Sequence, residues 1–467
     1  MTKDTKLFEG RFSEDPSEIF SLFVDSISFD IVLLPFDIKV SKAHANMLKE
    51  IGLIDEPTKN EILDGLNIIW TEYESGEFQK ALKPGDEDVH SAIERRLTEL
   101  KGDAGRALHT GRSRNDLAQM SGRLYCVFII DEISNELKNM ITTLAELASK
   151  NISLMMPGKT HLQHAQPILV SHWLLSHAFR LKNDIERLMQ TRKRVNVCVL
   201  GSGALAGSTL NLDANIIAKE LKCDSIVPNS IFGVSTRDYI LETLFDLSNI
   251  MINLSCLGED VVWATSTECD YATLDYRFSS GSSMMPQKKN PDIAELIRGK
   301  AGLSIGQLTA VLAMAKSQVF GYNHDLQVDK EALFASHKDC RIGIVAMNAM
   351  MATISFNENA LNESLKNQPL LLATDIAEQM VKEGIPFRIA YKQVASAIRS
   401  AMDRGLGAKE LVEELKNIEE IESSATKIFG NDILEAMRRS INSRNTIGGT
   451  STESVLEQIK LLKNNQN

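Results

Sequence analysis

The chain has 467 residues, of which 43% are hydrophobic, and its 51 basic and 62 acidic residues give a formal net charge of −11. This length exceeds one ordinary hydrophobic core, so we expect two or three domains, and the acidic balance argues against nucleic acid or anionic membranes as partners. The six cysteines form no CxxC pair, and the polar start of the chain leads into no long apolar run. We therefore expect reduced thiols, no structural zinc site, and a cytoplasmic protein without a membrane span.

Prolines outline the expected helices, because proline does not fit inside a regular helix. None occurs between residues 84 and 157, 167 and 228, 228 and 286, or 291 and 369. Within these intervals apolar residues recur at alternating spacings of four and three, which is typical of long helices packed along a seam. The seams run over residues 126–147, 174–188, 240–254, 297–312 and 340–354. They predict five helices of about 25 residues, each roughly 40 Å long.

These helices divide the chain into three expected regions. An N-terminal helical domain covers residues 1–112, a central long-helix bundle covers 113–358, and a C-terminal helical domain covers 359–467. Apolar stripes on such long rods need a partner surface, and bundles assembled between chains supply one. We therefore expect a homo-oligomer.

One short segment, GSSMMPQKKNP at residues 281–291, combines a nucleophile, two cations and loop-forming residues. Its glycine and two prolines keep it out of a regular helix, and Pro291 suits the first turn of a helix that follows. The positive end of that helix, together with Lys288, would attract an anion. We interpret the segment as a mobile catalytic loop; the alternative is an ordinary solvated loop.

Two histidines, His161 and His164, have a spacing that superficially resembles a metal site. No HExxH pattern is present and no third ligand is near in the sequence, so we expect no metal there. Pro167 indicates that this stretch is a loop or a helix start, where a histidine is more often structural.

The run GSGALA at residues 201–206 follows a strand-like segment and satisfies the GxGxxA pattern of NAD-dependent oxidoreductases. That fingerprint needs a βαβ unit within a larger set of alternating strands, whereas the flanks here have helical periodicity. We prefer a glycine-rich connector that lets helices and a ligand approach closely.

Arg112, Arg114 and Asn115 come just before or at the expected start of the first long helix. An arginine fork and an amide at this position are suited to grip a carboxylate through paired hydrogen bonds. The alternative is a surface arginine at a helix N-terminus, which the helix dipole disfavours unless an anion is bound.

Motifs along nearly the whole chain resemble one enzyme family. The loop fits GSSxMPxKxNP, and QKKNPD at 287–292 is similar to the argininosuccinate lyase form within the fumarase/aspartase superfamily. The other matching segments are DEDVH at 86–90 with ERRL at 94–97, HTGRSRND at 109–116, THLQ at 160–163 with AQP at 165–167, GSGALAG at 201–207, and YNHDLQ at 322–327 with DKE at 329–331.

The resemblance implies an all-α fold with a central bundle of five long helices flanked by two smaller helical domains. It implies a lyase that reversibly cleaves argininosuccinate to fumarate and arginine in arginine biosynthesis, with no cofactor and no metal. It also implies a homotetramer whose active sites are shared between subunits, so that assembly is required for activity.

The resemblance also assigns roles to residues. Ser282 is the base, Lys288 supports it, and His161, oriented by Glu295, is the proton donor. A serine hydroxyl is a poor base at neutral pH, and each pKa unit by which the loop favours the alkoxide requires about 1.4 kcal/mol. Whether His161 donates directly, through water, or only orients the substrate stays open. The implied substrate contacts are Ser26, Arg114, Asn115, Thr160, Asn290, Tyr322, Gln327 and Lys330.

The chain departs from the family pattern at Lys159, where an aromatic residue is usual, at His164, where Arg is common, at Leu117-Ala118, where Gln-Val is usual, and at Glu9, where Gly is usual. These departures bear on affinity and loop packing, and none removes a catalytic group. Two alternatives remain open: an adenylosuccinate lyase, and a structural protein that keeps the fold without turnover.

Overall fold

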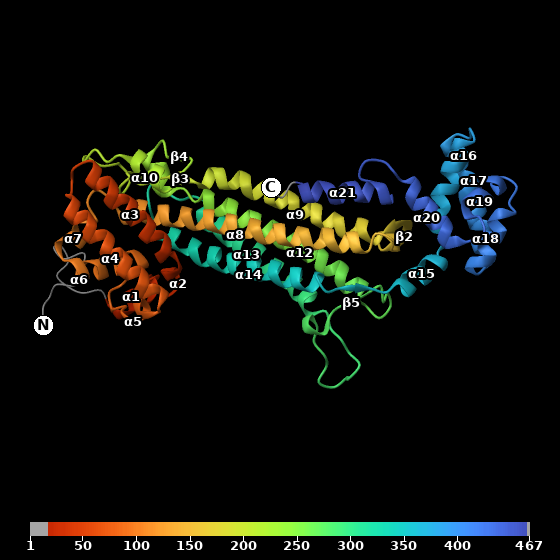
Figure 1. Ribbon diagram of the computed structural model, residues 1–467, viewed down its shortest axis with the longest axis horizontal. Helices are drawn as coiled ribbons and strands as arrows, with labels where there is room; N and C mark the ends of the chain where they lie inside the picture. Colours follow the sequence, from red (N-terminus) through yellow and green to blue (C-terminus); the bar gives the residue numbers. More distant parts are fainter. Residues whose placement is uncertain (1–16, 465–467) are drawn as a thin grey trace. The chain divides into compact units, whose positions relative to one another are not determined.

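The structure, a computed structural model, describes residues 17–464, most of which are helical (Figure 1). The departure from the family pattern at Glu9 lies outside the described residues. The α-helices are α1 (Glu18–Val24), α2 (Ile27–Asp30), α3 (Leu34–Glu50), α4 (Glu56–Glu74), α5 (Glu77–Lys80), α6 (Val89–Lys101), α7 (Asp103–Ala107), α8 (Arg114–Lys150), α9 (Val170–Val195), α10 (Ala214–Glu220), α11 (Ser230–Ser235), α12 (Asp238–Ala264), α13 (Asp292–Ala315), α14 (Asp329–Met351), α15 (Glu358–Lys366), α16 (Ala373–Lys382), α17 (Phe387–Asp403), α18 (Ala408–Lys416), α19 (Glu422–Phe429), α20 (Ile433–Ser443) and α21 (Thr452–Asn464). The 3₁₀ helices are η1 (Ile31–Leu33), η2 (Tyr276–Phe278), η3 (His324–Val328) and η4 (Pro369–Leu372). The strands are β1 (Met155–Thr160), β2 (Gln163–Leu169), β3 (Val197–Cys198), β4 (Ser225–Ile226), β5 (Ala272–Thr273) and β6 (Ser355–Phe356), and they pair as β1-β2, β3-β4 and β5-β6.

The five predicted long helices are confirmed as α8, α9, α12, α13 and α14, and with them the all-α fold class. They contain 37, 26, 27, 24 and 23 residues, so the first is much longer than expected. Each is free of proline, which allows its hydrogen-bond ladder to continue without a break.

Contacts divide the chain into two compact units. Among the described residues, the first unit contains 17–134, Glu186–Asn249 and Gly302–Cys340; the second contains Asn135–Ile185, Ile250–Ala301 and 341–464. Each of the five long helices has residues in both units. The expected domain boundaries at residues 112 and 358 divide the chain differently from these two units, and they stay a prediction.

Four of the five predicted seams are buried along most of their length within the chain, whereas the fourth, formed by Ile297, Ala301, Ile305, Leu308 and Leu312 on α13, is buried within the chain only at its first two residues. Ile305 and Leu312 are exposed, whereas Ser304 and Val311 are buried. The buried face of α13 therefore shifts by one residue after Ala301. The four-three spacing of the sequence fits both faces, because residues 302–315 of α13 include no charged side chain.

A local core in the first unit joins α3, the start of α8 and the segment around β3. It consists of Val40, Ala43, Met47, Leu48, Leu117, Met120, Cys198, Val199, Leu200, Ile217 and Ala218. Because β3 is part of this core, the glycine-rich segment that follows it is held close to the beginning of α8.

The second unit contains a β-hairpin that was not expected from the sequence. Residues 155–169, predicted as a loop or helix start, form the antiparallel pair β1-β2 with a register shift between Pro157 and Lys159. The two prolines at 157 and 167 are opposite each other in the register, where their missing N–H groups cost little pairing.

In the same unit α12, α13 and α14 approach closely at glycines. A Cβ added at Gly258 would lie 2.6 Å from the carbonyl oxygen of Ala294, and one added at Gly343 would lie 2.7 Å from Cδ1 of Ile297. The absence of side chains at these two positions lets the helices pack at this distance.

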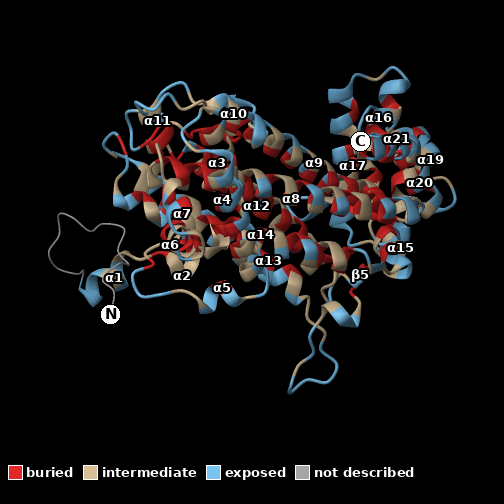
Figure 2. Cartoon of the chain, turned by 60° about the vertical axis from the view of Figure 1, so that its left-hand side comes forward, coloured by how far each residue is buried: buried red, intermediate tan, exposed pale blue. Residues whose placement is uncertain are grey.

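Two helical stretches, Glu18–Glu50 and Asp238–Ala264, are long and apolar enough by length and composition to cross a membrane, although each contains charged residues such as Asp30 and Glu259. The first is divided among several helices, because the backbone is extended at Asp25, where α1 ends. The second, α12, contains fully buried apolar residues such as Leu244. Figure 2 marks buried positions along this helix. Core packing therefore explains the apolar character of α12 without a membrane.

Candidate functional site

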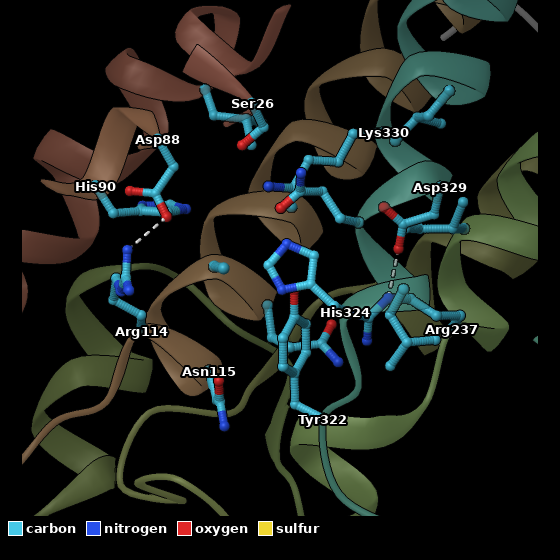
Figure 3. Close-up of a pocket in the computed structure, with 18 of the residues that line it drawn as sticks. Ser26, Asp88, His90, Arg114, Asn115, Arg237, Tyr322, His324, Asp329 and Lys330 are labelled. Atoms are coloured by element: carbon cyan, nitrogen blue, oxygen red, sulfur yellow. Dashed lines mark hydrogen bonds and ion pairs between the residues drawn. The ribbon is translucent and has the colours of Figure 1, made fainter. Parts of the chain in front are cut away.

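A cavity of about 170 Å³ lies within the first unit. Six of the predicted substrate-binding residues line it: Ser26, Arg114, Asn115, Tyr322, Gln327 and Lys330. Figure 3 labels all of these except Gln327. The other two, Thr160 and Asn290, belong to the second unit, as do the predicted catalytic residues. The structure thus gathers the predicted residues into two groups, one in each unit.

Helix ends place the cavity residues. Ser26 is the N-cap position of α2, and Arg114 and Asn115 begin α8. Tyr322, Gln327 and Lys330 come from the segment that forms η3 and starts α14. Residues more than 300 positions apart in sequence meet here, since the Nε2 atom of Gln327 donates to the carbonyl of Val24 at 2.8 Å.

Arg114 is held by two acidic residues at the cavity wall. Its Nη1 atom donates to Glu87 at 2.9 Å and to Asp88 at 3.1 Å. Burial alone would lower the pKa of Arg114, but these carboxylates outweigh it and raise that pKa. Burial alone would raise the pKa of Asp88, but His90 and Arg114 outweigh it and lower that pKa. The wall therefore carries stable opposite charges.

Lys330 and Ser26 share a buried acidic partner. The Oγ atom of Ser26 donates to Asp30 at 2.7 Å, and the Nζ atom of Lys330 lies 3.5 Å from the same carboxylate oxygen. The other oxygen of Asp30 accepts from the backbone N–H of Val89 at 3.1 Å. Asp30 thus ties α2, the start of α6 and the start of α14 to one point.

Arg237 and Asp329 form a buried ion pair in the cavity wall, and sequence reasoning did not single them out as site residues. Burial raises the pKa of Asp329, although the neighbouring Arg237 and Lys330 oppose the shift. Asp329 belongs to the DKE motif at residues 329–331, which could have marked it as a site residue. Arg237 lies outside all of the motifs that resemble the family.

Asp116 connects the glycine-rich segment to the cavity. Its carboxylate accepts backbone N–H groups from Ser113 at 2.9 Å, Gly203 at 2.8 Å and Gly201 at 3.3 Å. In addition, Asn115 Nδ2 donates to the carbonyl of Ala204 at 3.1 Å. The GSGALAG segment is therefore a connector that positions the start of α8.

The oxidoreductase alternative is not supported by this arrangement. The glycine amides that would face a pyrophosphate are bound by Asp116, and β3 is only two residues long. The next helix, α10, begins at Ala214, well after the glycines. A dinucleotide fingerprint requires the helix to start directly at the glycine turn.

The predicted catalytic loop lies between η2 and α13 in the second unit, where it projects from the helices (Figure 1). A bridge closes its neck, with the N–H of Asn290 donating to the carbonyl of Ser280 at 2.8 Å and the N–H of Ser280 donating to Asp292 at 2.7 Å. Its tip is open to solvent, with Met284 at 87% exposure. A pinned neck and an uncovered tip suit a loop that closes over a ligand.

Within the loop, the Oγ atom of Ser282 accepts two backbone N–H groups, from Met284 at 3.2 Å and Met285 at 3.0 Å. Hydrogen-bond donors aimed at an oxygen favour its negatively charged form. The local fold therefore supplies Ser282 with a feature that a base needs and that was not foreseen from the sequence.

The two lysines of the loop have different environments. Lys289 donates to the carbonyl of Leu274, and its ammonium lies 4.1 Å from the centroid of the Tyr276 ring. Lys288 is exposed and makes no ion pair with any residue in the described range 17–464. Lys289 therefore anchors the loop, while Lys288 is available to a ligand. The Nδ2 atom of Asn290 donates to the Oγ of Ser280 at 3.2 Å, two residues before Ser282 in the sequence.

His161 occupies the two-residue turn between β1 and β2. It and Leu162 have φ values of 55° and 58°, a conformation in which residues other than glycine are strained by about 1–3 kcal/mol each. His161, Thr160 and Glu295 are exposed, and within the described chain no hydrogen bond joins His161 to Glu295. The orientation of His161 by Glu295 stays a prediction.

Lys159 and His164, two departures from the family pattern, face each other in the hairpin register. The ammonium of Lys159 lies 4.3 Å from the ring centroid of Trp263 on α12, which fixes the hairpin to that helix. Burial and then the charge of Lys159 lower the pKa of His164. Over residues 17–464 no group of three His, Cys, Asp or Glu side chains is placed to hold a metal ion.

Comparisons with protein families cover most of the chain. A family model described as lyase matches residues 10–306, and one described as argininosuccinate lyase C-terminal matches residues 370–440. The argininosuccinate lyase of Ruthia magnifica subsp. Calyptogena magnifica is 40% identical over 460 residues, which cover 98% of this chain and 94% of the relative. That of Caldanaerobacter subterraneus subsp. tengcongensis is 43% identical over 446 residues, which cover 95% and 99%.

Solved structures share the fold at lower identity. An EDDS lyase variant with bound fumarate superposes with a TM-score of 0.78 at 23% identity, covering 94% of this chain and 87% of that one. A class II fumarase from Schistosoma mansoni gives a TM-score of 0.72 at 16% identity, covering 87% and 92%.

Proposed function

Because this chain belongs to the argininosuccinate lyase family, we propose that its two groups of site residues together carry out the elimination that releases fumarate and L-arginine from L-argininosuccinate. The protein is a lyase of arginine biosynthesis within the fumarase/aspartase superfamily. The assignment of Ser282 as the base rests on one observation. Its Oγ atom accepts hydrogen bonds from two backbone amides within an exposed loop that also contains two lysines.

The reaction removes a proton from the carbon next to a carboxylate and breaks the bond from the succinyl skeleton to a guanidino nitrogen. Ser282 takes the proton as its base, and the Met284 and Met285 amides stabilise the alkoxide that acts. The second negative charge develops on the substrate carboxylate, where Lys288 and the amide of Asn290 serve as donors once the loop closes.

The departing guanidino nitrogen is strongly basic and needs a proton. His161 supplies it, and Glu295 orients His161 in the closed state. The strained turn supports this role, because a two-residue turn of non-glycine residues with positive φ persists only where the surroundings impose it, often at functional sites. Thr160, next to His161 at the end of β1, contacts the substrate.

The first-unit cavity binds the rest of the substrate through Ser26, Arg114, Asn115, Tyr322, Gln327 and Lys330. It offers both cationic and acidic groups, which suits a molecule carrying carboxylates, an ammonium and a guanidinium. No cofactor enters the mechanism, since general base, general acid and electrostatic stabilisation are all supplied by side chains and backbone.

The protein works as a cytoplasmic homotetramer whose active sites combine residues of several subunits. Supporting this, α13 exposes the large apolar side chains Leu296, Leu303, Ile305 and Leu312. Exposed apolar surface of this kind marks interaction sites. Its position on a long helix of the predicted bundle suits packing against a second copy of the same helix.

The test is the ultraviolet absorbance of fumarate after purified protein is mixed with argininosuccinate, with adenylosuccinate and malate in parallel. Fumarate from argininosuccinate alone is the expected result. Fumarate from adenylosuccinate would move the assignment to that lyase, and silence with all three substrates from a folded oligomer would favour a structural protein.

A further inference from the structure

Two buried polar atoms that line the first-unit cavity lack a partner in the described part of the chain: Nε2 of His90 and Oδ1 of Asp329. His90 is 3% exposed and Asp329 is 2% exposed. A buried polar atom without a hydrogen bond costs about 1–3 kcal/mol, so folded proteins rarely retain one without a reason. A ligand that offers one acceptor and one donor would satisfy both atoms.

His90 is built to present a donor. Its Nδ1 atom contacts the buried carboxylate of Asp37, which only accepts hydrogen bonds, so Nδ1 carries a proton. Burial alone would lower the pKa of His90, but Asp37 outweighs it and raises that pKa; the nearby Asp88 adds to the rise and Lys330 opposes it. The doubly protonated ring is therefore favoured, and Nε2 carries a proton too.

Asp37 is itself fixed. Its other carboxylate oxygen accepts from the Oγ of Ser41 at 3.1 Å, and that Oγ accepts from Nη1 of Arg112 at 3.0 Å. Arg112, expected from the sequence to grip a substrate carboxylate, thus acts behind the cavity wall and does not line the cavity. The chain of contacts from Arg112 to Asp37 holds the His90 ring in one orientation.

Asp329 is built to present an acceptor. One of its oxygens is bound by Arg237, and the other has no partner among residues 17–464. Figure 3 shows Asp329 with Arg237 on one side of the cavity and His90 with Asp88 on the other. A cationic ligand group beside the second oxygen would favour the ionised carboxylate and offset its burial.

We propose that His90 and Asp329 bind the amino-acid head of the arginine half of the substrate, His90 its carboxylate and Asp329 its ammonium group. This inference rests on the proposed function. In argininosuccinate the bond that breaks lies at the guanidino end, which must be near Ser282 and Lys288. Neither of those residues lines the cavity, so the cavity suits the opposite end of the arginine half.

The test is calorimetric titration of the intact protein with three ligands: L-arginine, agmatine, which lacks the carboxylate, and guanidinovalerate, which lacks the ammonium group. Wild type is expected to bind arginine about tenfold or more tightly than either analogue, as one charge-assisted contact warrants. His90→Asn keeps a donor toward Asp37 but presents none at the Nε2 position. It should lose the preference for arginine over agmatine and keep the preference over guanidinovalerate.

Asp329→Asn should show the reverse pattern, losing only the preference over guanidinovalerate. His90→Gln, which places an amide N–H near the Nε2 position, should recover part of the preference over agmatine. Circular dichroism and the solution mass of each variant verify that it is folded and assembled.

Equal weakening of all three ligands in His90→Asn, or no measurable arginine binding by wild type, overturns the inference. The binding readout is independent of turnover. If wild type prefers arginine over both analogues but releases no fumarate, only the proposed reaction is refuted. If wild type releases fumarate and both Asn variants keep the wild-type preference for arginine over both analogues, only this inference is refuted.

Discussion

Gly258→Ala adds one methyl group where α12 approaches the start of α13 closely in the second unit. The new Cβ would lie 2.6 Å from the carbonyl oxygen of Ala294 and 2.7 Å from Cγ2 of Ile297, well inside normal contact distance. The carbonyl belongs to helix backbone and cannot rotate away, so overpacking costs about 1–3 kcal/mol. The better helix propensity of alanine returns about 1 kcal/mol. The variant should therefore be destabilised, and the start of α13, which holds the loop neck through Asp292, should shift with it.

Gly343→Ala is the matched control for Gly258→Ala. Its Cβ would meet Cδ1 of Ile297 at 2.7 Å, but that atom ends a side chain that can change rotamer. Helix propensity is gained equally in both variants, so their difference isolates the clash, and it should be about 1–3 kcal/mol in urea unfolding. Turnover should fall only in Gly258→Ala. If Gly258→Ala is as stable as Gly343→Ala, α12 and α13 do not pack as closely at Gly258 as the structure indicates.

Three further outcomes follow from other features. Burial raises the pKa of Asp116 to about 6, so between pH 4 and 6 the folded state holds a proton that the unfolded state releases. The free energy of unfolding of wild type should therefore fall by about 3 kcal/mol as pH rises through that window, and Asp116→Asn should lack this fall. If urea titrations give the same pH dependence for wild type and Asp116→Asn, the raised pKa of Asp116 is contradicted. Lys288→Met should reduce kcat by at least about a hundredfold if it stabilises the developing charge, whereas Lys289→Met should chiefly lower the stability of the loop neck; equal kcat values would contradict the distinction. Leu303→Glu places a charge on the exposed face of α13 and should lower the solution mass measured by light scattering, while an unchanged tetramer mass would exclude that face as an interface.

The long helices could be predicted from the sequence, because proline-free intervals and apolar periodicity are local properties. The face of α13 could not be fixed in the same way, since Ile305 and Val311 are equally apolar and only packing decides between them. The β1-β2 hairpin was missed for a related reason. Each strand contains a proline, which is unusual in strands, and the turn that joins them is formed by His161 and Leu162 instead of the Asn-Gly or Asp-Gly pairs typical of two-residue turns.

Motifs supplied the residues of the site but not their partners. Lys288 and Lys289 are indistinguishable in the sequence, whereas the structure engages Lys289 and leaves Lys288 exposed. Arg237 gave no signal, because an ion pair between residues 92 positions apart has no local pattern. His90 was visible in the DEDVH segment, but its pairing with Asp37 depends on the packing of α6 against α3.

The proposed role of Ser282 as the base of an argininosuccinate lyase can be tested directly, because Ser283 beside it provides a matched control. Fumarate absorbance should be followed with argininosuccinate for wild type, Ser282→Ala and Ser283→Ala. Ser282 accepts two backbone amides, whereas Ser283 accepts none within the described residues, so only the first substitution should abolish fumarate release while both variants stay folded. Fumarate release by Ser282→Ala at a rate close to that of wild type would show that Ser282 is not the base.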